Sequence, residues 1–447
     1  MTADQIMIRL KEHGFSSYKV GGFVRDYLLG HKNSDIDIAT SATAEEMLQL
    51  FDDMKVKKAG QRFGVLIIDG IEVATFRREQ YLIQGKPQVF PVKTFEEDAS
   101  RRDFTINAMA MDLDGNLLDP FHGVEDLKEK RIRAVGIADT RFEEDPIRIV
   151  RGIGLAARLG FEIEEETWLA MKRCTGMLQH IPPERIGKEM QKMCQSACLS
   201  TGLHLMEQVG LVSVILPLLE HLPNTEQNPK YHHLNAWMHT LAVIQYIEKL
   251  SPLVRTDDLI WAAMFHDAGK GLPGIRAYHL RSQQPSDHGH DEKSVEIAEE
   301  TLTHWAIHKN TKQRVLLLIR YHMSMPKALT AEELLRFLRF LCQDWAQIDT
   351  FRRFLDQLFW LKMADLHGKD PKNIHQDQEL LSEMWRRMRV LLHRIPLYRE
   401  QTSIRAEDFE EEGEELGIRL RYELRQIQEA LLQKEDWEDV FLQRKEV

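Results

Sequence analysis

A glycine pair followed by two alternating carboxylates constrains this chain more than any other feature. The stretch runs from Val20 to Gly30, with Gly21-Gly22 near its start, and continues through residues 34–40 with Asp35 and Asp37. It predicts a helix start, a helix, a tight loop and a strand. Because side chains alternate on a strand, both carboxylates point to one face. Two carboxylates can hold Mg²⁺, and glycines let backbone amides approach a phosphate. Together these residues predict a site for a nucleoside triphosphate and its metal ions.

Residues 1 to about 135 alternate helical and strand patterns. Asp4 to His13 has the apolar spacing of an amphipathic helix. Two apolar runs, 65–68 and 71–76, flank Asp69-Gly70, a pair typical of a hairpin turn. These patterns predict a small mixed α/β head over residues 1–135.

Helical periodicity replaces the strand patterns from about Asp139 onward. Pro182-Pro183 and the prolines between 217 and 229 interrupt it, and the polar stretch 222–230 predicts a linker. We therefore expect an α+β protein with four parts: a head at 1–135, an all-α neck at 136–221, a second helical domain at 222–370 and a helical tail at 371–447.

Bulk properties narrow the class of protein. The 447 residues are 43% hydrophobic and contain no apolar run near the ~18 residues of a membrane span. The first residues lack a basic segment before an apolar one, and the four cysteines form no CxxC pair, so we expect a cytoplasmic protein that does not contact a membrane. The net charge of −11 excludes a broad basic surface, so any nucleic acid must bind a local patch.

Four motifs in the first 200 residues resemble, in order, those of class II tRNA nucleotidyltransferases, the bacterial CCA-adding enzymes and their poly(A) polymerase relatives. The resemblance implies a polymerase-β-like head. The motifs are Gly21-Gly22-x-Val24-Arg25-Asp26, Asp35-x-Asp37, the run from Arg101 to Ala110, and Glu144-Asp145-x-x-Arg148-x-x-Arg151.

The resemblance implies roles for the first two motifs. Asp35 and Asp37 would hold Mg²⁺, which activates the 3′-hydroxyl of the primer, with Glu72 as the candidate third carboxylate. Gly21-Gly22 and Arg25 would bind the nucleotide. The residues alone leave another interpretation open, in which the carboxylates mark a solvent-facing strand edge and Glu72 is a solvated strand residue.

The third motif would contact the triphosphate and the sugar through Arg101, Arg102, Asp103 and Asn107. Arginine suits this task because its planar fork pairs with two phosphate oxygens. The alternative is that Arg101 and Arg102 are ordinary surface charges.

The fourth motif has two compatible interpretations. Asp145 can be a helix N-cap with Pro146 as the first helical residue. On a helix, Asp145 and Arg148 also share a face, so a carboxylate acceptor and an arginine donor can meet one nucleobase. The resemblance implies that this pair selects C and A, with Glu144 and Arg151 beside it in the nucleotide site.

Two departures from the family pattern leave the product open. After Arg151 the family usually continues with Ala-x-Arg-Phe, whereas this chain has Gly152-Ile153-Gly154-Leu155. The loop that usually carries Arg-Arg-Pro corresponds to Arg77–Pro87 and lacks that sequence. An enzyme that adds only CC, or only A, is therefore an alternative.

Arg185, Lys188 and Lys192 fall at i, i+3 and i+7 on a helix whose other face carries apolar residues. This pattern is either an ordinary amphipathic helix or a stripe that follows tRNA phosphates. For the tail we expect a role in supporting the tRNA body or a dimer contact, and we leave open a monomer or a homodimer.

The second helical domain carries an ordered set of metal-ligand residue types. Adjacent His266 and Asp267 can bind one metal only near a helix end, which Gly269 supplies. Single buried histidines are usually structural, but over about residues 231–368 the ordered set resembles the HD phosphohydrolase superfamily, which implies a divalent transition metal such as Mn, Ni or Fe. The set is His239, His266, Asp267, His290, His322 and Asp365.

These patterns predict a template-independent nucleotidyltransferase that adds CMP and AMP, from CTP and ATP, to the tRNA 3′ end by a two-metal reaction. An HD phosphohydrolase acting on 2′,3′-cyclic phosphates or nucleotide phosphates would follow it. The alternatives are an HD phosphohydrolase with an RNA-binding front domain, and a poly(A) polymerase, which the acidic composition disfavours.

Overall fold

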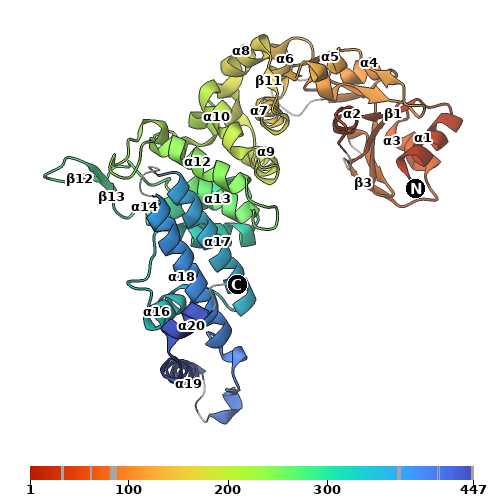
Figure 1. Ribbon diagram of the computed structural model, residues 1–447. Coiled ribbons are helices and arrows are strands. Elements are labelled where there is room, and N and C mark those ends of the chain that lie inside the picture. Colours follow the sequence, from red (N-terminus) through yellow and green to blue (C-terminus); the bar gives the residue numbers. More distant parts are fainter. Residues whose placement is uncertain are drawn as a thin grey trace. The chain divides into compact units, whose positions relative to one another are not determined.

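The computed structural model describes residues 1–31, 35–60, 63–80, 88–369, 374–409, 411 and 413–443 (Figure 1). The chain divides into two compact units, Met1–Pro217 and Leu218–Val447. Part of the predicted specificity loop, residues 81–87, lies outside the described residues.

The head is built on a seven-stranded sheet in the order β3-β4-β5-β2-β1-β8-β9. Neighbouring strands are antiparallel except for β2 and β5, which are parallel. A separate hairpin, β6-β7, follows β5. The strands are β1 (Ser17–Val20), β2 (Asp37–Thr40), β3 (Val56–Gly60), β4 (Val65–Ile68), β5 (Ile71–Thr75), β6 (Arg77–Gln80), β7 (Gln88–Pro91), β8 (Ala110–Met111) and β9 (Leu117–Leu118).

Alternation along β2 gives the sheet a core on each face. Ile38 packs with the apolar face of α1 in one cluster, whereas Ala39 packs with Val20 and Phe76 in the other. The predicted N-terminal helix is confirmed as α1, which begins with a capping box formed by Thr2 and Gln5. The head helices are α1 (Ala3–Glu12), α2 (Gly22–Leu28), α3 (Ala44–Leu50), α4 (Phe95–Ala99) and α5 (Gly123–Lys128).

The neck consists of six helices. It belongs to the first unit, together with the head. Helix α7 packs against α9 and α10, and α6 packs against α8. A short parallel pair joins β10 (Arg131–Ile132) to β11 (Glu162–Ile163). The helices are α6 (Ala138–Glu144), α7 (Ile147–Leu159), α8 (Glu165–Cys174), α9 (Pro183–Gln195), α10 (Leu199–Val209) and α11 (Val212–Ile215).

The second unit is a helical body in which α13 packs against α12, α15 and α17 (Figure 1). Toward the C-terminus, α18 packs against α16 and α17. The helices are α12 (Ala236–Glu248), α13 (Asp257–Phe265), α14 (His290–His304), α15 (Lys309–Tyr321), α16 (Ala331–Cys342), α17 (Ile348–His367), α18 (Ile374–Arg394), α19 (Gly413–Lys434) and α20 (Trp437–Gln443).

Two details of the sequence-based prediction are wrong. Strands recur after residue 139, as β11 and as a hairpin of β12 (Arg276–Tyr278) and β13 (Pro285–Asp287). These strands are too short for a hydrophobic pattern to reveal them. The predicted linker at 222–230 is instead packed structure, because Leu222, Thr225 and Gln227 are buried. The polar side chains there find partners: Gln227 accepts a hydrogen bond from Lys270 Nζ at 2.8 Å.

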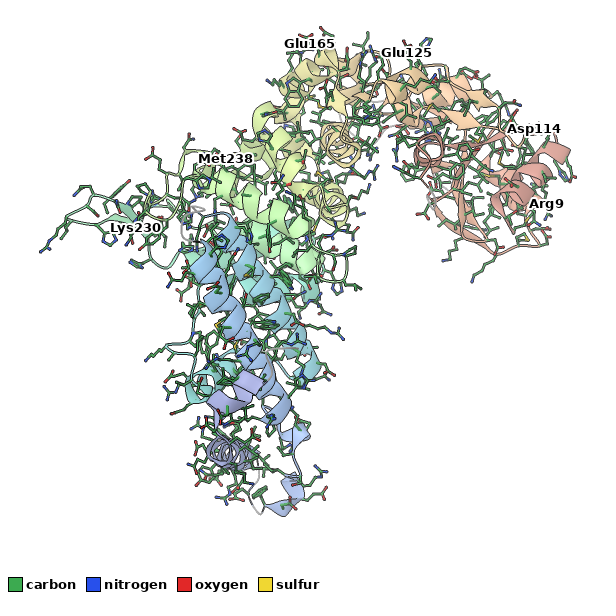
Figure 2. The ribbon with its side chains drawn as sticks, viewed as in Figure 1. Arg9, Asp114, Glu125, Glu165, Lys230 and Met238 are labelled. Carbon is green, nitrogen blue, oxygen red and sulfur yellow. The ribbon has the colours of Figure 1, made fainter. Side chains whose placement is uncertain are left out.

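The predicted fold class is confirmed as a mixed α/β head followed by a mostly helical body (Figure 1). Figure 2 shows the side chains on this frame, with Arg9 on α1, Glu165 at the start of α8 and Met238 on the first turn of α12. Among the helices that the structure describes, none combines the length and apolarity that crossing a membrane requires.

Candidate functional sites in the head and the HD domain

The glycine pair begins α2 as predicted. Gly21 has φ 67°, a left-handed conformation that favours glycine, and it precedes the first helical residue, Gly22. On the same helix, Arg25 is 4% exposed, and its guanidinium donates to Asp26 Oδ1 at 2.8 Å and to Asn107 Oδ1 at 2.6 Å. The helix therefore fixes Arg25 toward the third motif.

The three head carboxylates, Asp35, Asp37 and Glu72, lie at one end of the parallel strand pair. Asp37 of β2 is directly opposite Glu72 of β5, and Asp35 precedes β2 by two residues. Partial desolvation at the strand end and the neighbouring charges of Glu72 and Asp35 raise the pKa of Asp37 to about 6, although Arg102 opposes this. Carboxylates that repel one another suit a bound cation, but their oxygens do not lie within 4.8 Å of one another as a group of three.

Sequence reasoning missed Asp98, which holds two predicted arginines in place. Its carboxylate is buried and accepts from Arg101 Nη2 at 2.7 Å and Arg102 Nη2 at 2.9 Å. Burial alone would raise the pKa of Asp98, but Arg102 and Arg101 together keep it below its usual value. The spacing i, i+3, i+4 from Asp98, in the last turn of α4, to the two arginines that follow the helix is the signal that was available.

A chain of contacts joins the predicted residues of the third and fourth motifs. Asn107 bridges Arg25 to Asp103, donating to Asp103 Oδ1 at 3.1 Å. Asp103 Oδ2 accepts from Arg151 Nη1 at 3.0 Å, and Arg151 also pairs with Glu189. Burial opposes the ionisation of Asp103, but Arg151 keeps its pKa below the usual range. Both residues are therefore charged and fixed.

Asp145 and Arg148 have separate partners rather than one shared face. Arg148 is 5% exposed and donates to Glu144 Oε2 at 2.8 Å and to the Arg101 carbonyl at 2.8 Å. The Asp145 carboxylate pairs with Arg185 at 2.7 Å. The predicted N-cap is wrong by one residue, because α7 begins at Ile147 with Pro146 as its cap and no side-chain capping bond.

A cavity of about 380 Å³ lies beside the head carboxylates, within the first unit. Its lining brings together Gly22, Arg25, Asp37, Asn107 and Arg151 from the predicted set. Residues that the sequence analysis did not select also line it, namely Gly154, Arg158, Glu189, Met193, Ser196 and Cys198. The cavity lining therefore combines one of the three head carboxylates, Asp37, with the cations Arg25, Arg151, Arg158 and Lys192.

The predicted stripe on α9 is exposed. Arg185, Lys188 and Lys192 face solvent, whereas Ile186 and Met190 are buried. Lys192 pairs with Glu189 at 3.0 Å and also lines the head cavity. The helix thus presents its basic face beside the carboxylate site.

The six predicted residues of the second unit meet in one place, which we call the HD cluster (His239, His266, Asp267, His290, His322 and Asp365). As expected, His266 and Asp267 follow the end of α13 at Phe265. Two groups of ligand atoms lie within 4.8 Å of one another, and Asp267 belongs to both. One group is His239, His266, Asp267 and Asp365, and the other is Asp267, His290 and His322.

Backbone carbonyls orient every histidine of the cluster. The Nδ1 atoms of His239, His266, His290 and His322 lie 3.0, 2.8, 2.7 and 2.6 Å from the carbonyls of Gly368, Ala263, Asp287 and Ile319. A carbonyl only accepts, so Nδ1 carries the proton and the neutral ring presents its Nε2 lone pair. Among the described residues, the buried Nε2 atoms of His290 and His322 have no hydrogen-bond partner. These orphaned acceptors fit a divalent metal ion.

Charge in the cluster also favours a cation. Burial opposes protonation of His266, but Asp267 and Asp365 raise its pKa to about 9. Burial and the charge of His266 lower the pKa of His322 to about 3. Without a metal ion the two carboxylates therefore favour a proton on His266, and a bound cation would replace that proton.

Two glycines shape the cluster: Gly269, which the sequence analysis placed at the helix end, and Gly368, which it did not select. A Cβ on Gly368 would overlap the His239 imidazole, and one on Gly269 would overlap the His290 carbonyl. A cavity of about 450 Å³ opens beside the cluster and is lined by Lys270, Lys369 and Tyr231. The pairing of Lys270 Nζ with Asp267 at 2.7 Å places one cation at the rim.

Comparison with protein families divides the chain in the same order. The Poly A polymerase head domain matches residues 17–133, the family described as a probable RNA and SrmB-binding site of polymerase A matches 160–222, and the HD domain matches 236–343.

Relatives and solved structures agree with these matches. The chain is 44% identical over 204 residues to a CCA-adding enzyme of Streptococcus pneumoniae serotype 19F, covering 44% of this chain and 51% of that protein. It therefore spans about half the length of that relative. It is 36% identical over 283 residues to the CCA-adding enzyme of Streptococcus pyogenes serotype M2, covering 56% of this chain and 70% of the relative.

Among solved structures, the Bacillus stearothermophilus CCA-adding enzyme in complex with CTP has a TM-score of 0.65 at 25% identity and matches 96% of this chain and 92% of that one. A Thermotoga maritima CCA-adding enzyme complexed with tRNA shares the fold, with a TM-score of 0.55 at 20% identity over 96% and 93% of the two chains. With the ordered motifs gathered around one cavity, these matches lead to one conclusion: the chain belongs to the family of CCA-adding enzymes.

Proposed function

We propose that this chain adds CMP and AMP to the 3′ end of tRNA, completing or repairing CCA, with CTP and ATP as substrates. The single observation that carries the proposal is the parallel register of β2 and β5. It sets Asp37 opposite Glu72 at the wall of a cavity that Gly22, Arg25 and Arg151 also line. A site for two Mg²⁺ ions and a triphosphate needs this combination of carboxylates, glycine and arginine.

Each part of the site has a task in this reaction. Asp35 and Asp37, with Glu72 beside them, would hold the metal ions, which supply activation of the primer hydroxyl and neutralise charge on the leaving pyrophosphate. Arg101 and Arg102, fixed by Asp98, would hold phosphate oxygens in a forked geometry.

Base selection is assigned to Asp145 and Arg148. Their present partners, Arg185 and Glu144, would have to be exchanged for the edge of the incoming base. Arg151, which Asp103 and Glu189 hold, and Glu144, once released from Arg148, would lie beside the pair in the nucleotide site. Selection by protein groups removes the need for a template strand.

The number and identity of the nucleotides added to the RNA are a separate question. The altered sequence at 77–87 and the glycines after Arg151 keep an A-adding or CC-adding enzyme as the alternative. The experiment is incubation of the purified chain with tRNA lacking CCA, in the presence of CTP, ATP or both, followed by separation of products by length. A single C–C–A extension supports the proposal. No incorporation, or incorporation unchanged in the Asp35→Ala/Asp37→Ala variant, overturns it.

The same separation of products by length distinguishes the proposal from a poly(A) polymerase, and a binding assay distinguishes it from an RNA-binding front domain. A poly(A) polymerase would extend the primer by a long A tail rather than by three nucleotides. An RNA-binding front domain attached to a phosphohydrolase would shift the RNA in a binding assay without extending it. The opposed carboxylates at Asp37 and Glu72 favour a transferase over a binding module, which has no use for them.

A second activity is proposed for the HD cluster, which would hold one or two divalent transition-metal ions such as Mn, Ni or Fe. The observation that favours it is the orientation of four imidazoles by backbone carbonyls with Nε2 left to the metal. The metal would supply activated water for attack on a phosphate ester. Lys270 and Lys369 at the cavity suit an anionic substrate, such as a 2′,3′-cyclic phosphate or a nucleotide phosphate. Hydrolysis of such esters by the metal-loaded chain, lost in Asp267→Ala and kept in Asp35→Ala, is the test.

A further inference from the structure

Four cations line the head cavity, and three of them are already paired. Arg25 bonds Asp26 and Asn107, and Arg151 pairs with Asp103 at 3.0 Å. Lys192 pairs with Glu189 at 3.0 Å. These three side chains therefore enter any complex with their charge partly compensated by the protein.

Arg158, the fourth cation, differs from the others. It lies in the last turn of α7 and lines the cavity together with Asp37 and Gly22. Its side chain is exposed, and within the described part of the chain its guanidinium makes no hydrogen bond or ion pair. An arginine that keeps five donors without protein partners beside a cavity is available to a ligand.

The field around Arg158 favours an anion. Desolvation and the positive charge of Arg25 both keep the pKa of Arg158 below its usual value, while Asp26 and Glu189 oppose this weakly. Two guanidinium groups facing the same cavity repel each other until a negative group comes between them. Phosphate oxygens meet both forks with the geometry that arginine prefers.

Gly154 explains how Arg158 gains this position. The two residues are four apart on α7, share a face and both line the cavity. A Cβ at 154 would already lie 3.3 Å from Met193 Cγ, so a larger side chain there would have to displace Met193 at the cavity wall. This glycine stands where the family pattern places an arginine, and Arg158 lies one turn further along the same helix.

We propose that Arg158 is a phosphate-binding residue of the head cavity, pairing with a phosphate group of a substrate. The inference rests on the proposed nucleotidyl transfer and names a residue that neither the family motifs nor the sequence analysis assigns. The phosphate has two sources, the triphosphate of the incoming nucleotide and the backbone phosphate near the RNA 3′ end.

The test compares Arg158→Gln and Arg158→Lys with Arg173→Gln. Arg173 is a matched control because it lies on neck helix α8, pairs with Asp139 and is absent from the cavity lining. KM is measured separately for CTP, for ATP and for tRNA lacking CCA. A charge-assisted hydrogen bond predicts a rise of about tenfold or more in one KM for Arg158→Gln, with Arg158→Lys between it and the wild type.

The KM that changes identifies the source of the phosphate. A rise for the nucleotides assigns Arg158 to the triphosphate, and a rise for the RNA assigns it to the RNA backbone. If Arg158→Gln leaves all three values within twofold of the wild type, as expected for Arg173→Gln, the inference is overturned.

Direct binding separates this inference from the proposed function. Titration of ATP by calorimetry and of the RNA by filter binding requires no turnover. If the wild type fails to extend RNA, the proposed function fails, while a tenfold weaker binding of either ligand by Arg158→Gln still supports the phosphate site. Equal binding of both ligands by wild type and Arg158→Gln overturns the site.

Discussion

The head carboxylates and the HD cluster are two candidate metal sites built in different ways. The HD cluster is buried, its four imidazoles are fixed by backbone carbonyls, and its ligand atoms already lie within 4.8 Å of one another. The head carboxylates lie at a strand end beside an open cavity, and Asp35 and Asp37 are exposed. One site is assembled by the fold, whereas the other has ligands that the fold only brings near each other.

This difference fits the two activities proposed for the sites. A transferase site admits a nucleotide and an RNA end in every cycle, so its ligands gain from being accessible and from being completed by the substrate's own phosphates. A hydrolytic metal ion stays in place, so its ligands gain from orientation by outer contacts. The predictions below test whether the two sites are independent and whether outer contacts matter equally in each.

The largest expected effect is that of Asp267→Asn, because Asp267 belongs to both ligand groups of the HD cluster. If the HD cluster holds the proposed metal ion, we expect the purified variant to lose that metal and, with it, the proposed phosphohydrolase activity. Nucleotide addition should remain at the wild-type rate. Metal content by mass spectrometry and the two activity assays measure this.

Asp35→Asn is the reciprocal control for Asp267→Asn. It should abolish nucleotide addition and leave the metal content of the HD cluster unchanged. Loss of both activities in either variant would contradict the independence of the two sites.

The next largest effect is expected for Asp98, which holds Arg101 and Arg102 in place but is not itself a candidate ligand of metal or nucleotide. In Asp98→Asn, one buried charge that holds Arg101 and Arg102 is removed with little change of shape. Removing one partner of a buried pair costs about 3 kcal/mol of unfolding free energy, and nucleotide addition should fall about tenfold to a hundredfold as the two arginines lose their orientation. Chemical denaturation and the KM for CTP measure the two effects.

The pH dependence of the Asp98→Asn effect has a definite sign. The folded-state pKa of Asp98 is below its ordinary value, so its contribution to stability is present above the unfolded-state pKa of about 3.9 and is lost as the pH falls through the folded-state value. Wild type and variant should therefore approach each other in acid. Glu96→Gln, on the exposed face of the same helix, is the control and should change neither property.

Local spacing made the glycine pair and the Asp35-x-Asp37 carboxylates predictable, and the resemblance of an ordered set of residues made the HD cluster predictable. The register of β2 and β5 could not be predicted, since Asp37 and Glu72 are 35 residues apart in the sequence and meet only through strand pairing. The spacing of Asp98 at i, i+3 and i+4 from Arg101 and Arg102 is visible in the sequence, but an acid at that spacing is usually a surface residue. The burial of Asp98 depends on packing in the core.

Contacts that depend on backbone geometry escaped prediction for the same reason. Gly368 orients His239 through its carbonyl, across 129 positions of sequence. One partner of Arg148 is also remote in the sequence, since the Arg101 carbonyl lies 47 positions earlier. Residue types alone indicated convergence of Asp145 and Arg148, and only the structure gave each a separate partner.

A smaller effect, on metal affinity, is expected when the contact between the Gly368 carbonyl and His239 is disturbed. In Gly368→Ala, the added Cβ would overlap the His239 ring, so the ring must shift away from its carbonyl partner. Loss of such an orienting contact weakens metal affinity by about tenfold to a hundredfold. Competition with a chelator measures it. Gly176→Ala, where a Cβ would meet nothing within 4 Å, should leave the affinity unchanged. An unchanged affinity in both variants would mean that carbonyl orientation does not matter in this site.

The smallest effect tests whether burial, rather than spacing, gives Asp98 its importance. Glu383 on α18 repeats the same arrangement, pairing with Arg386 at i+3 and Arg387 at i+4 with distances of 2.6 Å. Its side chain is 33% exposed, whereas that of Asp98 is 1% exposed. Solvent screening should limit the loss in Glu383→Gln to about 1 kcal/mol at pH 7.

The arginines lower the pKa of Glu383 to about 2 through hydrogen bonds that outweigh burial. Its contribution is therefore complete above the unfolded-state pKa of about 4.3 and disappears as the pH falls toward 2. Urea denaturation of Glu383→Gln and wild type at pH 7 and pH 4 should show the difference narrowing, with nucleotide addition unaffected at neutral pH. A loss as large as that of Asp98→Asn would mean that the forked i+3, i+4 geometry, not burial, sets the strength of both pairs.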